Sequence, residues 1–247
     1  MLSVIIITKN ESEHIARCLD SVSWADEIIV LDSGSTDNTV DICKQYAADV
    51  YQTDWPGFGP QKQRALDKVS GDWVLSLDAD EYVPDALKIE IQQAIQQIET
   101  RGFEIPRLSS YCGKQMKHGG WWPDYVLRLF QRKHGQFTND IVHERIIVTG
   151  IIHKLETPLL HEAFIDPEEV LDKVNSYSSL GAKSLFEQGQ STTLLKALLK
   201  GIWAFFRTYI LKASCLDGTQ GLMLAISNAE GTYYKYVKLL HLQHKQE

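Results

Sequence analysis

Cysteine is scarce in this chain of 247 residues, and long apolar runs are missing. The four cysteines are scattered and form no Cys-x-x-Cys pair, which excludes a disulfide-built scaffold and a paired-cysteine zinc site, so we expect reduced thiols. No stretch of about 18 charge-free apolar residues occurs, and no segment is therefore expected to span a bilayer. The N-terminus lacks a basic region before its short apolar run and does not predict a signal peptide. These absences favour a cytosolic protein.

Glycine-rich phosphate loops and an excess of basic residues are also absent. Neither G-x-G-x-x-G nor G-x-x-x-x-G-K-[ST] occurs, which excludes a dinucleotide fingerprint and a P-loop. With 25 Lys and Arg against 32 Asp and Glu the net charge is −7, which argues against a general nucleic-acid binder. A composition of 44% hydrophobic and 23% charged residues is typical of a folded globular protein, and the length suits one large domain with or without an appendage.

The charge is divided unevenly along the chain. Residues 191–247 contain seven Lys or Arg and three Asp or Glu, a net charge of +4, so the first 190 residues carry −11. Each part is therefore expected to bind a partner whose charge is opposite to its own.

Apolar, β-branched runs alternate with amphipathic segments over the first third of the chain. The runs predict buried strands at residues 3–8, 27–31, 49–52 and 72–77. The segments between them predict helices from an N-cap at Asn10 or Ser12 to about residue 22, from about residue 40, and over residues 61–69. This alternation predicts right-handed βαβ units and an α/β fold with a mostly parallel sheet and helices on both faces.

The pattern changes after Glu81. A helix is predicted at residues 85–100, followed by strands at 103–106, 126–131 and 144–148, and the chain reads as wholly helical from Pro167 onward. We therefore expect one domain over residues 1–166, with two halves at 1–100 and 101–166. A helical region follows at 167–247.

Three predicted strands end in polar clusters, and ligands of open α/β sheets bind at that edge. Asp78-Ala79-Asp80 places two carboxylates at a strand end, where they could hold Mg²⁺ or Mn²⁺ together with substrate phosphates. The alternative is a helix N-terminus with solvated acids before Pro84. Asp32 is either a plain helix N-cap or a hydrogen-bond partner of a ribose or base.

Together these segments resemble the successive signatures of family 2 glycosyltransferases with the GT-A fold. They are residues 4–11 (VIIITKNE), 29–39 (IVLDSGSTDNT) and 71–81 (GDWVLSLDADE), in the order and spacing of that family. The resemblance implies inverting transfer of a sugar from a nucleotide-sugar. It implies that residues 1–166 are the catalytic domain, with the nucleotide-binding half at 1–100 and the acceptor half at 101–166. It also implies nucleotide-sugar binding by Thr8, Glu11, Asp32, Gly34, Asp78 and Ala79, with Asp78 near the ribose or the metal and Asp80 as principal metal ligand.

The helix before the third signature departs from many relatives, because residues 61–64 are Gln-Lys-Gln-Arg where Ala-Arg-Asn is frequent. Either Lys62 or Arg64 is expected to contact the diphosphate. His161 resembles the late histidine that some GT-A enzymes add to the metal or diphosphate, and a structural histidine is the alternative.

Inversion also requires a base that removes the proton of the acceptor hydroxyl on the face opposite the leaving group. Val-His-Glu segments like residues 142–144 follow Arg-Leu-Phe in lipopolysaccharide-core members of the family. The resemblance favours Glu144 as base with His143 orienting it or contacting phosphate. The alternative is a surface glutamate paired with Arg145.

Aromatic side chains near residue 121 are suited to stacking on a sugar. We expect acceptor binding by Trp121, Trp122, Asp124 and Arg128, with a core aromatic pair as the alternative for the tryptophans.

Residues 194–213 predict an amphipathic helix with a basic stripe. At 100° per residue, Lys196, Lys200 and Arg207 fall within about 40° of one another, and apolar residues fill a broad opposite arc. Such a helix is typical of a membrane interface with anionic headgroups, and the alternative is packing on the catalytic domain or on a partner subunit in a homo-oligomer. Residues 221–243 could pair with it as a helical hairpin.

The resemblance as a whole implies an enzyme at the cytoplasmic face of the bacterial inner membrane. The expected reaction moves glucose from UDP-glucose onto an inner-core heptose of lipopolysaccharide through a β-1,4 link, with Mg²⁺ or Mn²⁺ as cofactor. The alternatives are a nucleotidyltransferase, a D-x-D phosphohydrolase, and a catalytically silent membrane-associated scaffold that binds nucleotide.

Overall fold

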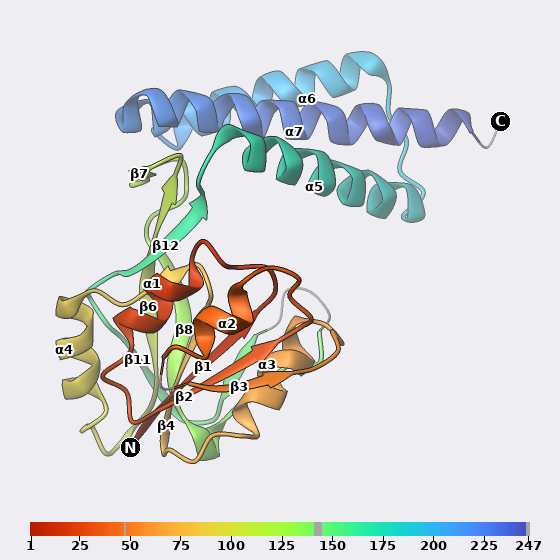
Figure 1. Cartoon of the computed structure of the whole chain (residues 1–247). Coiled ribbons are helices and arrows are strands. Elements are labelled where there is room, and N and C mark those ends of the chain that lie inside the picture. Colours follow the sequence, from red (N-terminus) through yellow and green to blue (C-terminus); the bar gives the residue numbers. More distant parts are fainter. Residues whose placement is uncertain (47, 141–144, 246–247) are drawn as a thin grey trace. The chain divides into compact units, whose positions relative to one another are not determined.

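The computed structural model describes residues 1–46, 48–140 and 145–245, and the chain divides into two compact units (Figure 1). The first unit comprises residues 1–107 and 124–161, and the second comprises residues 108–123 and those from 162 onward. Strands β6 and β12 contribute residues to both units. Whether the functional boundary falls at residue 166 stays a prediction.

The elements alternate over the first third of the chain. The strands are β1 (Leu2–Thr8), β2 (Glu27–Asp32), β3 (Asp49–Gln52), β4 (Trp73–Asp78), β5 (Glu81–Tyr82), β6 (Thr100–Tyr111), β7 (Lys114–Gln115), β8 (Asp124–Gln131), β9 (Gly135–Phe137), β10 (Ile146–Val148), β11 (Ile151–Lys154) and β12 (Leu159–Phe164). The helices are α1 (Ile15–Ser21), α2 (Thr39–Cys43), α3 (Phe58–Leu66), α4 (Asp85–Ala94), α5 (Pro167–Glu187), α6 (Leu194–Phe206) and α7 (Gly218–His244), with short helical turns η1 (Arg132–His134), η2 (Arg207–Leu211) and η3 (Ser214–Asp217).

The first unit is built on a mixed sheet in the order β3-β2-β1-β4-β8-β6-β12-β5. Strands β3, β2, β1 and β4 are parallel, whereas β8 joins β4 antiparallel. The register sets Thr8 opposite Asp32 and Ile7 opposite Asp78. The polar ends of three strands therefore meet at one edge of the sheet.

Alternate residues of the buried strands face two separate cores. Val4 and Ile6 pack on the side of α1, α2 and α4, whereas Ile5 and Ile7 pack on the side of α3. Helices thus cover both faces of the sheet, as predicted.

Several predicted boundaries are wrong. Helix α3 spans Phe58–Leu66 rather than 61–69, and strand β6 spans Thr100–Tyr111 rather than 103–106. Helix α1 begins at Ile15 rather than after Asn10 or Ser12, because Asn10 adopts a left-handed φ of 56° and its side chain accepts a hydrogen bond from the Thr36 amide. Helix α4 ends at Ala94 rather than near residue 100, because Thr100 begins β6 and pairs with Ile151 of β11.

The second unit is mainly helical, as predicted from Pro167 onward. Helix α7 packs along both α5 and α6, so the predicted pairing of the last two helical segments is confirmed (Figure 1). A small core of Tyr111, Met116, Val170 and Leu224 joins α5 and α7 to the end of β6. Among the helices in the described residues, none is both long and apolar enough to cross a membrane.

Candidate active site

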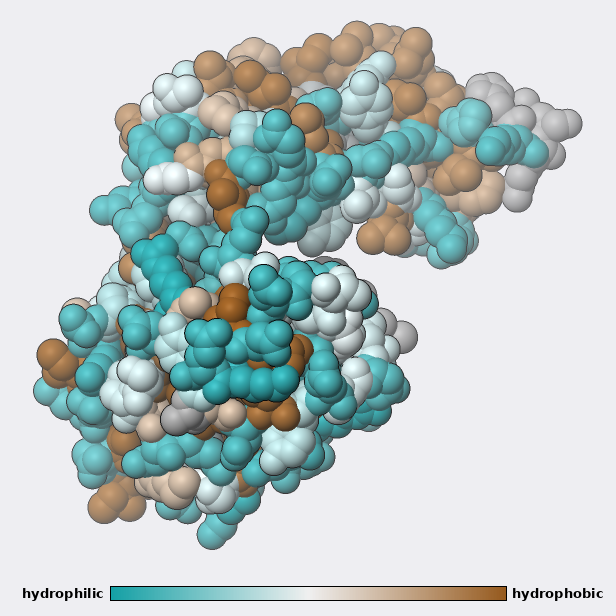
Figure 2. Space-filling view, in the orientation of Figure 1, coloured by the Kyte–Doolittle hydropathy of each residue, from teal (hydrophilic) through white to brown (hydrophobic). Residues whose placement is uncertain are grey.

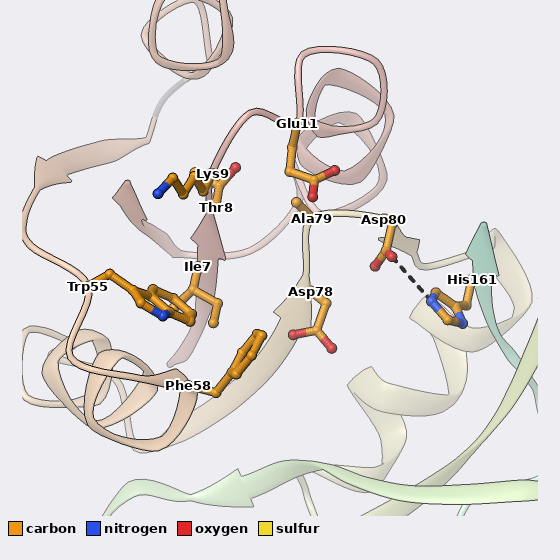
Figure 3. A pocket seen from close by; sticks show the side chains of 10 residues that line it. All are labelled: Ile7, Thr8, Lys9, Glu11, Trp55, Phe58, Asp78, Ala79, Asp80 and His161. Atoms are coloured by element: carbon orange, nitrogen blue, oxygen red, sulfur yellow. Dashed lines mark hydrogen bonds and ion pairs between the residues drawn. The ribbon is translucent and has the colours of Figure 1, made fainter. Parts of the chain in front are cut away.

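A pocket of about 430 Å³ lies at the carboxyl ends of β1 and β4, within the first unit (Figure 3). Six of the residues singled out from the sequence line it: Thr8, Glu11, Asp78, Ala79, Asp80 and His161. The other described lining residues are Ile7, Lys9, Trp55 and Phe58. This is the edge at which open α/β sheets bind ligands.

The first two signature segments hold each other in place beside this pocket. The Asn10 amide donates to Ser35 Oγ and the Thr36 amide donates to Asn10 Oδ1, each at 2.8 Å. The Glu11 amide donates to Thr39 Oγ1, also at 2.8 Å. Polar residues of these segments therefore fix the loop after β1 against the loop after β2.

Asp32 stabilises the loop that follows it by accepting hydrogen bonds from that loop. Its buried carboxylate accepts hydrogen bonds from the amides of Gly34 and Ser35, each at 3.0 Å, and from the Ser35 hydroxyl. It is not the N-cap of α2, which is Asn38. Gly34 has a φ of +83°, a conformation that glycine adopts without strain. Neither Asp32 nor Gly34 lines the pocket, and their nucleoside contacts stay predictions.

Asp78 points into the pocket (Figure 3), and its carboxylate is paired with two cations. Its Oδ1 lies 2.8 Å from Nζ of the buried Lys62, and its Oδ2 accepts a hydrogen bond from Nη2 of Arg128. Burial raises the pKa of Asp78, but the charges of Arg128 and Lys62 outweigh that effect and hold the pKa well below its usual range. Asp78 is therefore ionised at neutral pH, with both oxygens already paired.

Arg128 is buried beneath the pocket, among acids. Its Nη2 also lies 2.7 Å from Oε1 of the fully buried Glu81, which Arg107 approaches at 3.4 Å. Burial lowers the pKa of Arg128, but the charges of Asp78 and Glu81 outweigh that effect and raise the pKa above its usual range. The acceptor contact predicted for Arg128 is not among these interactions and stays a prediction.

Asp80 and His161 form a second polar pair on the pocket wall. Asp80 Oδ2 lies 3.2 Å from His161 Nε2, whereas Asp80 Oδ1 is buried and has no hydrogen-bond partner in the described part of the chain. Thr8 Oγ1 is likewise buried without such a partner. Both residues line the pocket, so these two oxygens have unused hydrogen-bonding capacity beside it.

The predicted metal ligands do not form a complete protein site. No group of three or more His, Cys, Asp or Glu side chains suited to a metal ion occurs among the described residues. Asp80 and His161 nevertheless fit a divalent cation, since Mg²⁺ is commonly bound through one or two carboxylates together with substrate phosphates. The unsatisfied Asp80 Oδ1 is the oxygen that suits this role.

Neither candidate for the diphosphate contact lines the pocket. Lys62 is buried and paired with Asp78, as described above. Arg64 lies on the exposed side of α3, with its Nη1 2.7 Å from Oδ1 of Asp54. The choice between these two residues stays open.

Trp55 and Phe58 were not predicted as site residues. Their rings pack edge to face with centroids 4.8 Å apart, and both line the pocket while remaining partly exposed. Partly exposed aromatic pairs suit stacking on flat or apolar ligand faces. The available signal was two aromatic residues spaced by Pro56 and Gly57 directly after a strand at the same sheet edge.

Three further predicted site residues, Trp121, Trp122 and Asp124, do not line the pocket. His143 and Glu144 are outside the described residues. Trp121 lies in the second unit, where its ring packs on Tyr111 and Phe164 at centroid distances of 5.8 and 6.0 Å.

Trp122, also in the second unit, is partly buried. Asp124 begins β8 in the first unit and accepts a hydrogen bond from Arg107 Nη2 at 2.8 Å. Acceptor binding by Trp121, Trp122 and Asp124 stays a prediction.

The chain belongs to a known enzyme family. The sequence model described as "Glycosyl transferase family 2" matches residues 3–154, more than half of the chain. The fold is accordingly the GT-A fold predicted from the sequence, extended by C-terminal helices. The chain is a nucleotide-sugar glycosyltransferase, so the nucleotidyltransferase, phosphohydrolase and silent-scaffold alternatives are set aside.

Two relatives are similar to the chain over nearly its whole length. The chain is 32% identical to an uncharacterized glycosyltransferase of Rickettsia prowazekii, over 100% of this chain and 89% of the relative. It is 29% identical to the lipopolysaccharide core biosynthesis glycosyltransferase LpsC of Rhizobium meliloti, over 96% and 91%. Among solved structures, S. aureus TarS 1–349 is similar with a TM-score of 0.49 and 15% identity, over 100% of this chain and 92% of that one.

Proposed function

We propose that this glycosyltransferase moves glucose from UDP-glucose onto a heptose of the lipopolysaccharide inner core, with inversion and a β-1,4 link. The similarity to a relative named for lipopolysaccharide core biosynthesis supports the acceptor class. The observation that carries the catalytic part is the buried, unsatisfied Asp80 Oδ1 beside His161 in the strand-end pocket. The catalytic domain is proposed to span residues 1–166.

The donor diphosphate is proposed to bind where the pocket is most polar. Asp80 and His161 would hold Mg²⁺ or Mn²⁺, and the bound cation neutralises the charge of the departing UDP. Asp78, kept ionised by Lys62 and Arg128, is proposed to accept a hydrogen bond from the ribose.

Residues around the polar centre position the nucleoside. Thr8 Oγ1 is a second unsatisfied group available to the ligand, and Glu11 lies on the same wall. Trp55 and Phe58 present aromatic surface on which the uracil base can stack.

The proposed base is Glu144, oriented by His143, and the residues on both sides of this segment support the assignment. Thr138 and Arg145 pair through two hydrogen bonds, at 2.9 and 3.0 Å. The Asp140 carbonyl accepts a hydrogen bond from the Gly59 amide at 3.2 Å, next to Phe58 in the pocket wall. The ends of the segment are thus held near the donor pocket.

The decisive experiment measures glucose transfer to purified core lipopolysaccharide from a panel of UDP-sugars, with and without Mg²⁺ or Mn²⁺. Asp80→Asn keeps the size of the side chain but removes its charge, so kcat should fall on the order of 100-fold or more. Asp72→Asn, at the exposed opposite end of β4, is the matched control and should keep normal activity. Full activity of Asp80→Asn in the presence of chelator would refute the metal-assisted mechanism, and transfer from another UDP-sugar alone would refute glucose as the donor.

An apolar surface on α6 supports a peripheral position on the inner face of the inner membrane (Figure 2). Leu195, Leu198, Leu199, Ile202 and Trp203 are each about half exposed or more, and the surface continues through Phe206 and Ile210. Lys196, Lys200 and Arg207 are exposed on the same stretch. Exposed apolar side chains beside cations suit insertion at an anionic headgroup layer, where the glycolipid acceptor would be presented.

Membrane association is tested by sedimentation with vesicles of phosphatidylglycerol or phosphatidylcholine. Changing Lys196, Lys200 and Arg207 together to Gln should weaken binding to the anionic vesicles by about 100-fold, since each cation near such a surface contributes about 1 kcal/mol. The control is Lys183→Gln, on exposed α5 surface. Unchanged sedimentation, together with a concentration-dependent oligomer that the α6 variant loses, would instead assign this surface to a partner subunit.

A further inference from the structure

A second cavity, of about 280 Å³, lies between α5 and α7 and is lined entirely by residues of the second unit. Its floor is aromatic, formed by Tyr111, Trp121 and Phe164. The rings of Trp121 and Phe164 lie 6.0 Å apart with an interplanar angle of 35°, and Trp121 remains partly exposed. Such a floor matches the apolar C–H face of a sugar ring.

The cavity also has hydrogen-bonding groups spaced around the aromatic floor. Ser227 shares a 2.9 Å hydrogen bond with the Tyr111 hydroxyl. Thr232 lines the same wall, and Asn228 donates to Thr208 at 3.3 Å, which leaves its carbonyl oxygen available. Neutral hydroxyl and amide groups above an apolar floor are typical of sites that bind polyhydroxylated ligands.

The charge of the cavity has one sign. Lys173 and Lys235 line it, and no Asp or Glu does so among the described residues. Lys173 pairs with Glu169 at 2.9 Å beside the cavity, whereas the Lys235 ammonium has no hydrogen bond or ion pair with any described residue. The stem of Lys235 runs over Gly181 of α5, where a Cβ would lie 2.8 Å from the lysine side chain. An unpaired ammonium at this place favours an anionic group on the ligand.

The volume restricts the ligand to about one sugar ring, because it is at the lower end of small-molecule sites, which run from about 300 to 1,000 Å³. We infer that the helical unit binds an acidic monosaccharide residue, one that carries a carboxylate or a phosphate group. The cavity is present whatever reaction the enzyme catalyses, but the inference that its ligand is a residue of the acceptor glycan rests on the proposed function.

The test titrates the full-length protein with glucuronate, glucose 6-phosphate, glucose and inorganic phosphate, followed by calorimetry and tryptophan fluorescence. At least one acidic sugar should bind about tenfold or more tightly than both glucose and inorganic phosphate, and the preferred one distinguishes carboxylate from phosphate. Lys235→Gln should weaken that binding about tenfold and leave glucose unaffected. Lys183→Gln, on the exposed face of α5, is the matched control and should change nothing.

Failure of both acidic sugars to bind more tightly than glucose and inorganic phosphate, or an unchanged affinity of the preferred acidic sugar in Lys235→Gln, would each overturn the inference. Titration of the same variants with UDP-glucose separates it from the proposed function, since the donor pocket contains none of these residues. Normal acidic-sugar binding without UDP-glucose binding would refute the proposed donor alone. Normal UDP-glucose binding without acidic-sugar binding would refute the second site alone.

Discussion

The first unit places a connected set of charged side chains under its pocket, whereas the second unit places much of its apolar surface in contact with solvent. In the first unit Lys62, Arg128 and Glu81 are almost fully buried, and they pair with one another or with Asp78. In the second unit, apolar side chains of α6 such as Leu195 and Trp203 are more than half exposed.

Both arrangements are costly for a protein that only has to fold. Removing charges from water costs several kcal/mol per ion, which paired geometry offsets only in part. Large apolar patches on a soluble surface mark places where another molecule binds. The comparison therefore indicates that each unit has a feature that folding alone does not require: buried charge beside the strand-end pocket in the first, and exposed apolar surface, which we propose meets a lipid surface, in the second.

The strongest test of the buried network is Arg128→Met. This change leaves Asp78 and Glu81 without their shared partner, so the free energy of unfolding in urea should fall by about 3–5 kcal/mol. Lys154→Met, which removes an exposed cation 3.6 Å from Glu104, should cost less than about 1 kcal/mol. If the two variants were equally stable, the network would not be the costly feature of this unit.

Gly59→Ala tests how tightly the first unit holds the segment that leads to the proposed base. A Cβ at Gly59 would lie 2.0 Å from the Thr138 carbonyl oxygen and 2.9 Å from that of Asp140, both backbone atoms. We expect a loss of about 1–3 kcal/mol in thermal unfolding, with reduced transfer activity. Gly231→Ala on α7, where the new methyl meets only ordinary contacts, is the control and should be neutral or slightly stabilising.

The loss of stability at acid pH should depend on Asp78. Because its pKa is lowered in the folded state, its contribution to stability is complete above its unfolded pKa of about 3.9 and is lost as the pH falls toward the folded pKa. Between pH 5 and pH 3 this group should account for about 1 kcal/mol of lost unfolding free energy. Asp78→Asn should show a correspondingly shallower dependence on pH, and an identical dependence would contradict the assignment.

The smallest effect on stability is expected on α6. Leu199→Gln and Trp203→Gln change side chains that are already more than half exposed, so unfolding should shift by less than about 0.5 kcal/mol. Vesicle binding should nevertheless weaken, because apolar area inserted into the interface is lost. Ile98→Gln, an exposed apolar residue of the first unit, is the control for both measurements. Destabilisation by more than about 2 kcal/mol would mean that α6 packs as a core helix.

Much of the donor pocket was predictable because its residues stand at or just after the ends of predicted strands. Thr8, Asp78 and Asp80 end β-branched or apolar runs, and parallel strands bring their carboxyl ends together whatever the loops between them do. The aromatic pair Trp55 and Phe58 was missed because the course of its loop depends on packing against the pocket wall.

The partners of these residues were decided by long-range pairing. Arg128 lies 50 residues after Asp78, and antiparallel pairing of β8 with β4 brings the two together. The same holds for His161 and Asp80, which are 81 residues apart and meet because β12 pairs with β5. A linear pattern of residue types carries no signal for the contact of Arg128 with Asp78, and only the family resemblance indicated that of His161 with Asp80.

The sequence by itself determined the family, the fold class, the strand-end acids and the amphipathic character of α6, because each depends on local spacing or on periodicity. Only the tertiary structure decided which acid is already paired and which has a free oxygen, since that follows from the sheet register. It also decided that Trp121 forms the floor of a separate cavity in the helical unit, because strand β6 and helices α5 and α7 must pack together before that cavity exists.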